Sequence, residues 1–300
     1  MSSDSNYYIP EQSPYPVMTA LAMGLLALGG GLAVQGKGMI ILTLGLALLA
    51  VMFYLWFGTV IKENMAGLTS PQLKRSFVWG MSWFIFSEVM FFAVFFGALF
   101  YIRIYVMPWL SGEGDKSDMI SLVWPGFQAE WPLMTNPDQV VGGEKFVGPE
   151  KNMSFPGWGG LLGWLPLWNT IVLLTSSVTV HWAHHAMKHN DRSKFNMWLG
   201  ITVLLGISFL VLQYLEYHHA YVDMGLTLKS GIYGTTFFML TGFHGFHVTM
   251  GTLMLLIQFL RGLKGHFSAD DQFGFEASSW YWHFVDVVWL GLFIFVYVLG

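Results

Sequence analysis

The chain has 300 residues, of which 54% are apolar and only 11% are charged, with a formal net charge of −4. Soluble domains carry about 25% charged residues, so this composition excludes a soluble globule and a disordered chain. The small net charge gives no basic surface for nucleic acid. The absence of cysteine excludes disulfides, thiolate-bound metals and a cysteine nucleophile. The sequence therefore predicts an integral membrane protein.

The polar N-terminal segment, residues 1–16, contains no Lys or Arg. It lacks the basic region of a cleavable signal, so the first apolar run is expected to remain as a helix. A helix needs about 20 mainly apolar residues to cross the hydrocarbon core, and a membrane β-barrel would show alternating segments instead. The apolar runs predict an all-α membrane protein with seven transmembrane helices, at 17–34, 39–61, 77–106, 165–187, 195–217, 232–260 and 280–299.

The connections between these runs predict the domain organisation. The first two runs are joined by residues 35–38, so they are expected to form an antiparallel hairpin over 17–61, followed by an inner loop at 62–76. The remaining residues, 77–300, are expected to form a five-helix bundle. One long outer connection, 107–164, interrupts the bundle and is rich in proline and glycine, which favours a loop rather than a further span.

The distribution of basic residues predicts the orientation in the membrane, because cytoplasmic loops collect Lys and Arg. Short loops on the opposite face hold Lys37 and Lys229. Short loops on the N-terminal side hold many more cations: Lys62, Lys74, Arg75, Lys188, Arg192, Lys194, Arg261 and Lys264. We therefore expect a cytoplasmic N-terminus and a C-terminus outside.

Glu88, in WFIFSEVMFF, lies about halfway along the third run. An ionisable side chain at that depth is costly and usually marks a function or a buried partner. Loss of water favours the neutral form of a carboxyl group unless a cation pairs with it. Two interpretations fit: a neutral acid hydrogen-bonded to a neighbouring helix, and a proton-handling site.

Histidines and acids recur at one-turn spacing in the later runs or just beyond them. They are His181, His184 and His185, then Glu216 and His219, His244 and His247, and His283 and Asp286. Imidazole is a common ligand of zinc, copper and iron, and Glu-x-x-His occurs in di-iron bundles, so a metal-bearing enzyme is one interpretation. Small residues surround these positions, which equally fits closely packed helices with polar side chains bonding across them.

Five ordered segments carry a family resemblance. They are SEVMFF, NTIVLLTSSVTVHWAHHA, TTFFMLTGFHGFHV, FGFEA and WYWHFVDVVWL, which begin at Ser87, Asn169, Thr235, Phe273 and Trp280. Along nearly its whole length the chain resembles subunit III of the haem–copper cytochrome c oxidases. The resemblance implies no catalytic residue and no metal in this chain, because the haems and copper of that family belong to partner subunits I and II.

The resemblance also implies an architecture and a set of sites. A V-shaped cleft filled with phospholipid is expected to separate the hairpin from the five-helix bundle. Glu88 matches the family's buried carbodiimide-reactive glutamate. Lipid-binding positions of the family match Trp56, Lys62, Glu63, Arg261, Lys264 and His266. The polar residues expected to pack helices and bond across them are His181, His184, His185, Glu216, His244, His247, His283 and Asp286.

The resemblance further implies a non-catalytic core subunit of a proton-pumping cytochrome c oxidase in aerobic respiration. Such a subunit stabilises subunit I, supports proton uptake and binds structural phospholipid, and cytochrome c donates electrons to the complex. The connection at 107–164 is longer than in mitochondrial members, which favours a bacterial inner (cell) membrane. The alternative is the equivalent subunit of a quinol oxidase, whose members commonly lack the first two helices. A transporter or receptor would show a repeat around a polar site, and none is visible.

Overall fold

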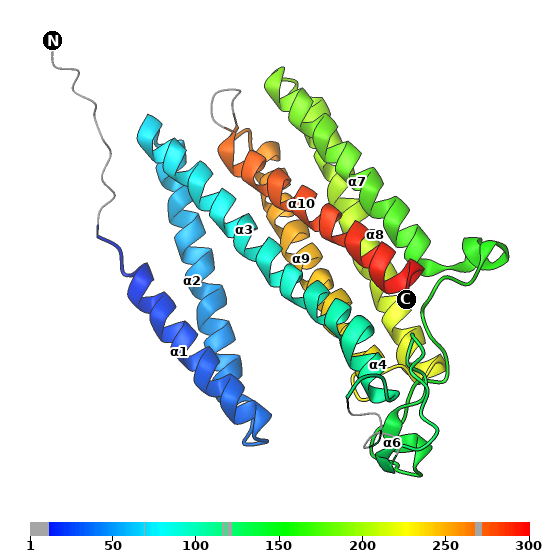
Figure 1. Cartoon of the computed structure of the whole chain (residues 1–300). Helices are drawn as coiled ribbons and strands as arrows, with labels where there is room; N and C mark the ends of the chain where they lie inside the picture. Colours follow the sequence, from blue (N-terminus) through cyan, green and yellow to red (C-terminus); the bar gives the residue numbers. More distant parts are fainter. Residues whose placement is uncertain (1–11, 69, 116–117, 119–121, 268–271) are drawn as a thin grey trace. The chain divides into compact units, whose positions relative to one another are not determined.

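The computed structural model describes residues 12–68, 70–115, 118, 122–267 and 272–300. Most of the predicted N-terminal segment 1–16 lies outside these residues. Every regular element in the described part is a helix, and the chain divides into two compact units, Met1–Gly80 and Met81–Gly300 (Figure 1). The V-shaped cleft implied by the resemblance stays a prediction, and each unit is described by itself.

Six helices of the described chain are long and apolar enough to cross a membrane. They are α1 (Tyr15–Val34), α2 (Ile40–Met65), α3 with its continuation to Leu110 (Pro71–Leu110), α8 (Arg192–Asp223), α9 (Ile232–Leu263) and α10 with its continuation (Phe273–Val298). The prediction of an all-α, multi-pass membrane protein is confirmed. The fourth predicted span, 165–187, also forms a helix, α7 (Leu165–Lys188), but this helix is not among the six that are apolar enough, so the number seven stays a prediction.

The first unit contains the expected hairpin of α1 and α2. Its turn uses Gly36 and Gly38, whose φ angles of 73° and 102° lie in the left-handed region that favours glycine. Glycines also set how closely the helices approach. A Cβ on Gly29 would overlap the backbone of Leu42, and one on Gly45 would lie 2.9 Å from the backbone nitrogen of Leu26. The hairpin is therefore a small-residue helix contact of the kind common in membranes.

The second unit is built on four helices that pack in a ring: α7 on α8, α8 on α9, α9 on α10 and α10 on α7. Large side chains fill its interior, among them Phe209, Trp282 and Trp289, which are fully buried. Both tryptophans lie on α10, two turns apart, and so face the same side of that helix. Their indole nitrogens donate to α7, from Trp282 to the Ser176 hydroxyl and from Trp289 to the Thr170 hydroxyl, each at 2.9 Å.

Helix α3 joins this ring mainly through aromatic side chains. Phe84 stacks on Tyr281 of α10 with ring centres 6.0 Å apart, and Phe91 meets Phe243 of α9 edge-on at 5.0 Å. The helix continues beyond Tyr101 through a π-helical segment, η1 (Ile102–Val106), into the short helix α4 (Met107–Leu110). The long connection consequently starts after Leu110 rather than at residue 107.

The described part of the long connection is ordered against the ring. It contains a short helix, α6 (Pro137–Val140), and a 3₁₀ segment, η2 (Trp158–Gly163). The backbone N–H of Met153 donates to the Tyr233 hydroxyl of α9, and that of Phe155 donates to the Tyr297 carbonyl, both at 2.9 Å. Backbone groups of the connection are thereby satisfied by the ends of the membrane helices.

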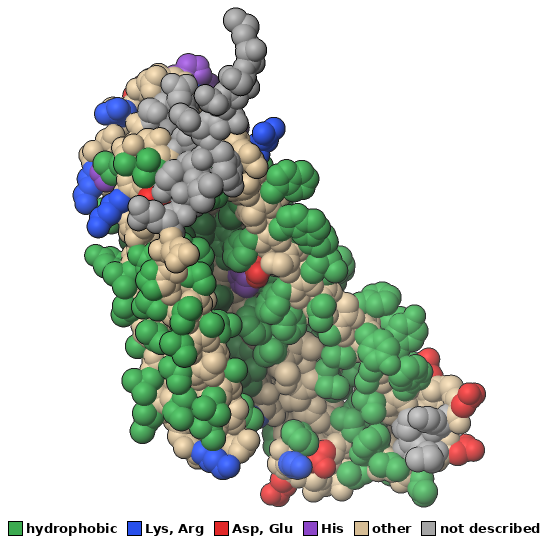
Figure 2. All heavy atoms as spheres, turned by 90° about the vertical axis from the view of Figure 1, so that its left-hand side faces the viewer, with side chains coloured by type: hydrophobic (Ala, Val, Ile, Leu, Met, Phe, Trp, Pro, Cys, Tyr) green, Lys and Arg blue, Asp and Glu red, His purple; other side chains and the backbone are tan. Residues whose placement is uncertain are grey.

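In the view of Figure 2, most charged side chains lie near the helix ends, while hydrophobic side chains cover most of the helix sides. Helix α8 shows how charged residues come to lie at the helix ends. It begins at Arg192 and ends at Asp223, beyond both ends of the predicted apolar run. Asp191 precedes it and caps it, because the backbone N–H of Lys194 donates to the Asp191 carboxylate at 3.1 Å. The helices therefore extend past the apolar stretches that predicted them.

Candidate functional site

The second unit pairs Glu88 of α3 with His247 of α9. Glu88 Oε2 lies 2.9 Å from His247 Nε2, and only 6% of the histidine side chain is exposed. Aromatic rings surround the imidazole: Phe92 lies edge-on at 4.9 Å and Tyr281 is stacked at 6.3 Å. The acid predicted from the sequence thus has a hydrogen-bond partner on a neighbouring helix, in a largely apolar setting.

The second nitrogen of His247 restricts the protonation of this pair. Nδ1 lies 2.6 Å from the carbonyl oxygen of Phe243, and a carbonyl only accepts, so Nδ1 carries a hydrogen. A neutral His247 then offers Nε2 as an acceptor, to which a protonated Glu88 donates. A charged His247 would instead donate to a Glu88 carboxylate. Either form holds one proton between Oε2 and Nε2 and has no net charge, which limits the cost of burial.

Two further histidines bond to α7 or α10. His283 Nδ1 lies 2.9 Å from the Ser177 hydroxyl of α7 and 3.5 Å from the carboxylate of Asp286, which is buried. His244 is fully buried on α9, and its Nε2 donates to the Val285 carbonyl of α10 at 3.2 Å. These side chains lie at contacts between helices of the ring.

The histidine group on α7 is divided between two faces of the helix. His184 Nε2 lies 3.3 Å from Glu276 Oε1 at the start of α10. His181 and His185 are instead exposed on the surface of α7. They do not pack between helices of this chain, which differs from the expectation for them. The reason is angular: residues 181 and 185 are four apart and share a face, whereas residue 184 is turned away from it.

Glu216 occupies the interior of the ring on α8. Its side chain is buried, and Oε1 accepts a hydrogen bond of 2.6 Å from the Tyr297 hydroxyl. His219, three residues further on, pairs with Asp223 on the exposed surface at 2.8 Å. The Glu-x-x-His pattern therefore does not bring its two side chains to one point. In the part of the chain that the structure describes, no three His, Asp or Glu side chains come together as a metal site.

The residues matched to lipid binding fall in both units. In the first unit, Trp56 stacks on Phe57 with ring centres 6.0 Å apart, and Lys62 is exposed while Glu63 is half-buried in the last turn of α2. In the second unit, Lys264 is exposed and His266 is half-buried.

Arg261 is turned inward rather than toward the surface. It is buried, it donates to the Gln258 side chain at 3.1 Å, and its guanidinium lies 4.6 Å from the Phe267 ring centre. Of the cations matched to lipid, Lys62 and Lys264 are thus the exposed ones. Their lipid role stays a prediction.

Several polar contacts of the ring escaped sequence reasoning. Trp282, Trp289 and Tyr297 each donate to a buried acceptor on another helix. For the two tryptophans, the sequence did offer a pattern: they are seven residues apart, so they face one side of their helix, and another helix of the bundle is rich in Ser and Thr, which can accept from them. The hydrogen bond from Arg103 to the carbonyl of Leu299, at 2.8 Å, could not be predicted from the sequence, because every residue has a backbone carbonyl and no residue type marks the one that accepts.

Comparison with known proteins identifies the family. The family model described as cytochrome c oxidase subunit III matches residues 5–111 and 163–300. The chain belongs to the cytochrome c oxidase subunit III family. It is 37% identical to cytochrome c oxidase subunit 3 of Hippopotamus amphibius over 295 residues, which cover 98% of this chain and 97% of that protein. The subunit 3 of Petromyzon marinus is 38% identical over 296 residues, with the same shares covered.

Membership of the subunit III family makes this chain a multi-pass membrane subunit of cytochrome c oxidase, an oxidoreductase complex of the respiratory chain. It also implies that the chain assembles with other subunits of that complex. The family match leaves out residues 112–162, which are nearly the whole of the long connection. The Glu88–His247 pair and the paired residues of α7 and α10 all lie within the matched ranges.

Proposed function

We propose that this chain is a non-catalytic core subunit of a proton-pumping cytochrome c oxidase. It would contact subunit I, assemble with subunit II in the same complex, support proton uptake and hold structural phospholipid. The haems and copper would lie in those partner subunits, and cytochrome c would donate the electrons. The two-helix hairpin of α1 and α2 supports this over a quinol oxidase, because quinol-oxidase members commonly lack these helices.

The proposal that this chain has a structural rather than a catalytic role rests on one observation. Two acids of the second unit bond in pairs across helices instead of converging on one point: the half-buried Glu88 with His247, and the buried Glu216 with Tyr297. Such pairs fix the contacts of α3 with α9 and of α8 with the end of α10. A rigid helical scaffold is what a stabilising subunit must offer to its partners.

We further propose a placement in a bacterial inner (cell) membrane with the N-terminus in the cytoplasm. Lys188, Arg192, Lys194 and Lys264 lie where α7 ends, α8 begins and α9 ends, so they share one end of the ring, as the positive-inside rule requires of a cytoplasmic face. In this placement α7 also crosses the membrane and brings the number of spans to seven, within a five-helix bundle that follows the hairpin of residues 17–61.

Comparing the oxidase purified with and without this chain tests the proposed role. Without the chain, we expect haem and copper content and initial oxygen reduction to persist. Proton uptake should become slower at alkaline pH, and activity should decay sooner during turnover. Adding back the chain is the control. Loss of haem or copper from the depleted complex, or stoichiometric metal in the isolated chain, would contradict a non-catalytic role. Oxidation of quinol instead of cytochrome c by the complex would favour the alternative.

A further inference from the structure

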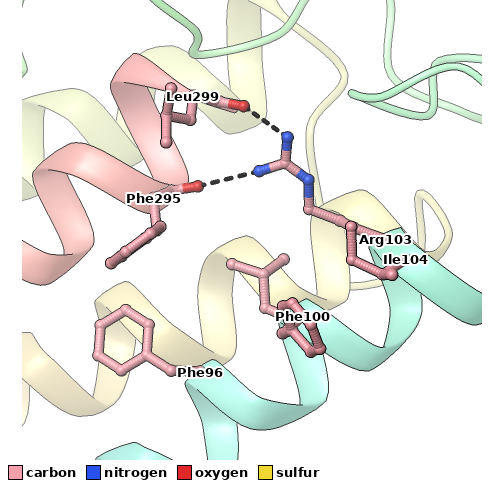
Figure 3. Close-up of a pocket in the computed structure, with 7 residues that line it drawn as sticks. Phe96, Phe100, Arg103, Ile104, Phe295 and Leu299 are labelled. Atoms are coloured by element: carbon pink, nitrogen blue, oxygen red, sulfur yellow. Dashed lines mark hydrogen bonds between the residues drawn. The ribbon is translucent and has the colours of Figure 1, made fainter.

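A cavity of about 320 Å³ lies between α3 and the π-helical end of α10, η3 (Phe293–Val298). Apolar side chains line it, including Phe96 and Phe100 on α3 and Phe295 on η3, and Arg103 is its charged member. Figure 3 shows the Arg103 side chain reaching across from η1, the continuation of α3, to the backbone of the opposite helix, beside the phenyl rings. None of the positions matched to family lipid contacts belongs to this cavity.

The Arg103 guanidinium has only neutral partners in the described structure. It donates to the carbonyl oxygens of Leu299 at 2.8 Å and Phe295 at 3.4 Å, and it lies 5.4 Å from the Trp131 ring centre. No described carboxylate lies within ion-pair distance of it. A guanidinium has five N–H donors, and these two bonds leave donors for another acceptor. A cation beside an apolar cavity in a membrane protein favours an anionic ligand.

The depth of the site indicates what kind of anion fits. Tyr101, Tyr105 and Trp109 form consecutive ring contacts at 5.6 Å and 6.0 Å along the same stretch of helix as Arg103, and such aromatic groups mark the headgroup level of a membrane. Phe96 lies seven residues from Arg103, or about 10 Å deeper along the helix. The cavity thus has its charge at headgroup depth and its apolar walls toward the hydrocarbon.

We propose that this cavity binds one anionic phospholipid of the leaflet on the side of the long connection. The phosphate lies at Arg103, where charge-assisted hydrogen bonds form, and one acyl chain lies along Phe96, Phe100 and Phe295. The volume is near the lower limit of ligand pockets, about 300 Å³, so it accommodates part of one chain and leaves the second chain in the bilayer.

Native mass spectrometry of the purified oxidase complex, titrated with phosphatidylglycerol or phosphatidylcholine, tests this site. Arg103→Gln keeps hydrogen-bond donors but removes the charge, and we expect it to weaken phosphatidylglycerol binding by roughly tenfold to hundredfold. Arg103→Lys keeps the charge and should weaken binding less. Lys151→Gln removes an exposed cation of the long connection and serves as the matched control, with affinity unchanged.

A second variant tests the apolar walls independently of the charge. Ile104→Trp places a large ring at the cavity and should reduce binding of phosphatidylglycerol while Arg103 is intact. Equal affinity of wild type and Arg103→Gln would overturn the proposal, as would equal affinity for phosphatidylcholine, or tight binding of a fatty acid in place of the phospholipid. The thermal midpoint of each complex, measured without added lipid, shows whether a variant lost binding only because its helices came apart.

Discussion

Replacing Glu88 separates the hydrogen bond of the Glu88–His247 pair from its acidity. Glu88→Gln removes the titratable group, but its amide N–H can still donate to His247 Nε2. Glu88→Ala removes the partner altogether. Because His247 Nδ1 is engaged by the Phe243 carbonyl and the side chain is only 6% exposed, its Nε2 would then be stranded among aromatic rings.

The size of the effect follows from this burial. Stranding a buried polar group costs about 1–3 kcal/mol, whereas hydrogen bonds between membrane helices average about 0.6 kcal/mol and reach about 1.7 kcal/mol. We expect Glu88→Ala to destabilise the assembled complex by about 1–2 kcal/mol more than Glu88→Gln. The coupling energy between Glu88→Ala and His247→Leu should be about 0.6–1.7 kcal/mol, because removing both partners strands neither.

Unfolding midpoints of the purified complex, converted to free energies, give the four corners of this cycle. Equal destabilisation by Glu88→Ala and Glu88→Gln would refute the hydrogen-bond argument, as would a coupling energy of zero. Oxygen reduction by the same samples tests the role of the pair. We expect Glu88→Gln to retain most of it. If Glu88→Gln abolished oxygen reduction in a fully assembled complex, the pair would have to belong to an obligatory proton path.

Three further outcomes are expected. Gly29→Val should loosen the hairpin by about 1–3 kcal/mol, seen as lower assembly yield, while Gly30→Val, whose Cβ would have no other atom within 4 Å, should not. Ser176→Ala should strand a buried indole N–H and cost about 1–3 kcal/mol in unfolding experiments, whereas Ser208→Ala on the exposed side of α8 should cost little. The backbone N–H of Lys194, in the first turn of α8, holds the pKa of Asp191 below its ordinary value of 3.8. The stability gained from this cap is therefore fully present above pH 3.8, and it is lost as the pH falls through the lower pKa of the folded state. Asp191→Asn should remove that part of the pH dependence of the thermal midpoint.

The helices themselves were largely predictable, but their ends were not. The thickness of the hydrocarbon layer sets the length of an apolar run, whereas the helix itself continues until its backbone is capped or a turn begins. Helix α10 therefore begins at Phe273, about two turns before the predicted start at residue 280, since its first turns contain Glu276, Ser278 and Ser279. Helix α3 begins at Pro71 rather than at residue 77 for the same reason.

The partners of the polar residues could not be predicted from spacing. His244 and His247 are one turn apart, yet the first bonds to α10 and the second to α3. Side chains three residues apart on a helix point in directions that differ by about 60°. This difference is enough for the two side chains to face different helices in a packed ring. The depth of Glu88 was visible in the sequence, but its partner lies 159 residues away and depends on how α3 and α9 pack.

Helix α7 shows why hydropathy understates some membrane helices. With 24 residues it is about 36 Å long, enough for a hydrocarbon core of about 30 Å. The Ser and Thr hydroxyls of α7 lower its average hydropathy, because a hydropathy scale assigns each hydroxyl the cost of leaving water without a hydrogen-bond partner. Yet Thr170 and Ser176 donate to carbonyls of their own helix and accept indole N–H groups from α10. A hydroxyl that meets its partners inside the protein costs far less to bury than one facing lipid. The polarity of α7 therefore reflects its place in the ring, between α8 and α10, and supports its proposed assignment as a membrane span.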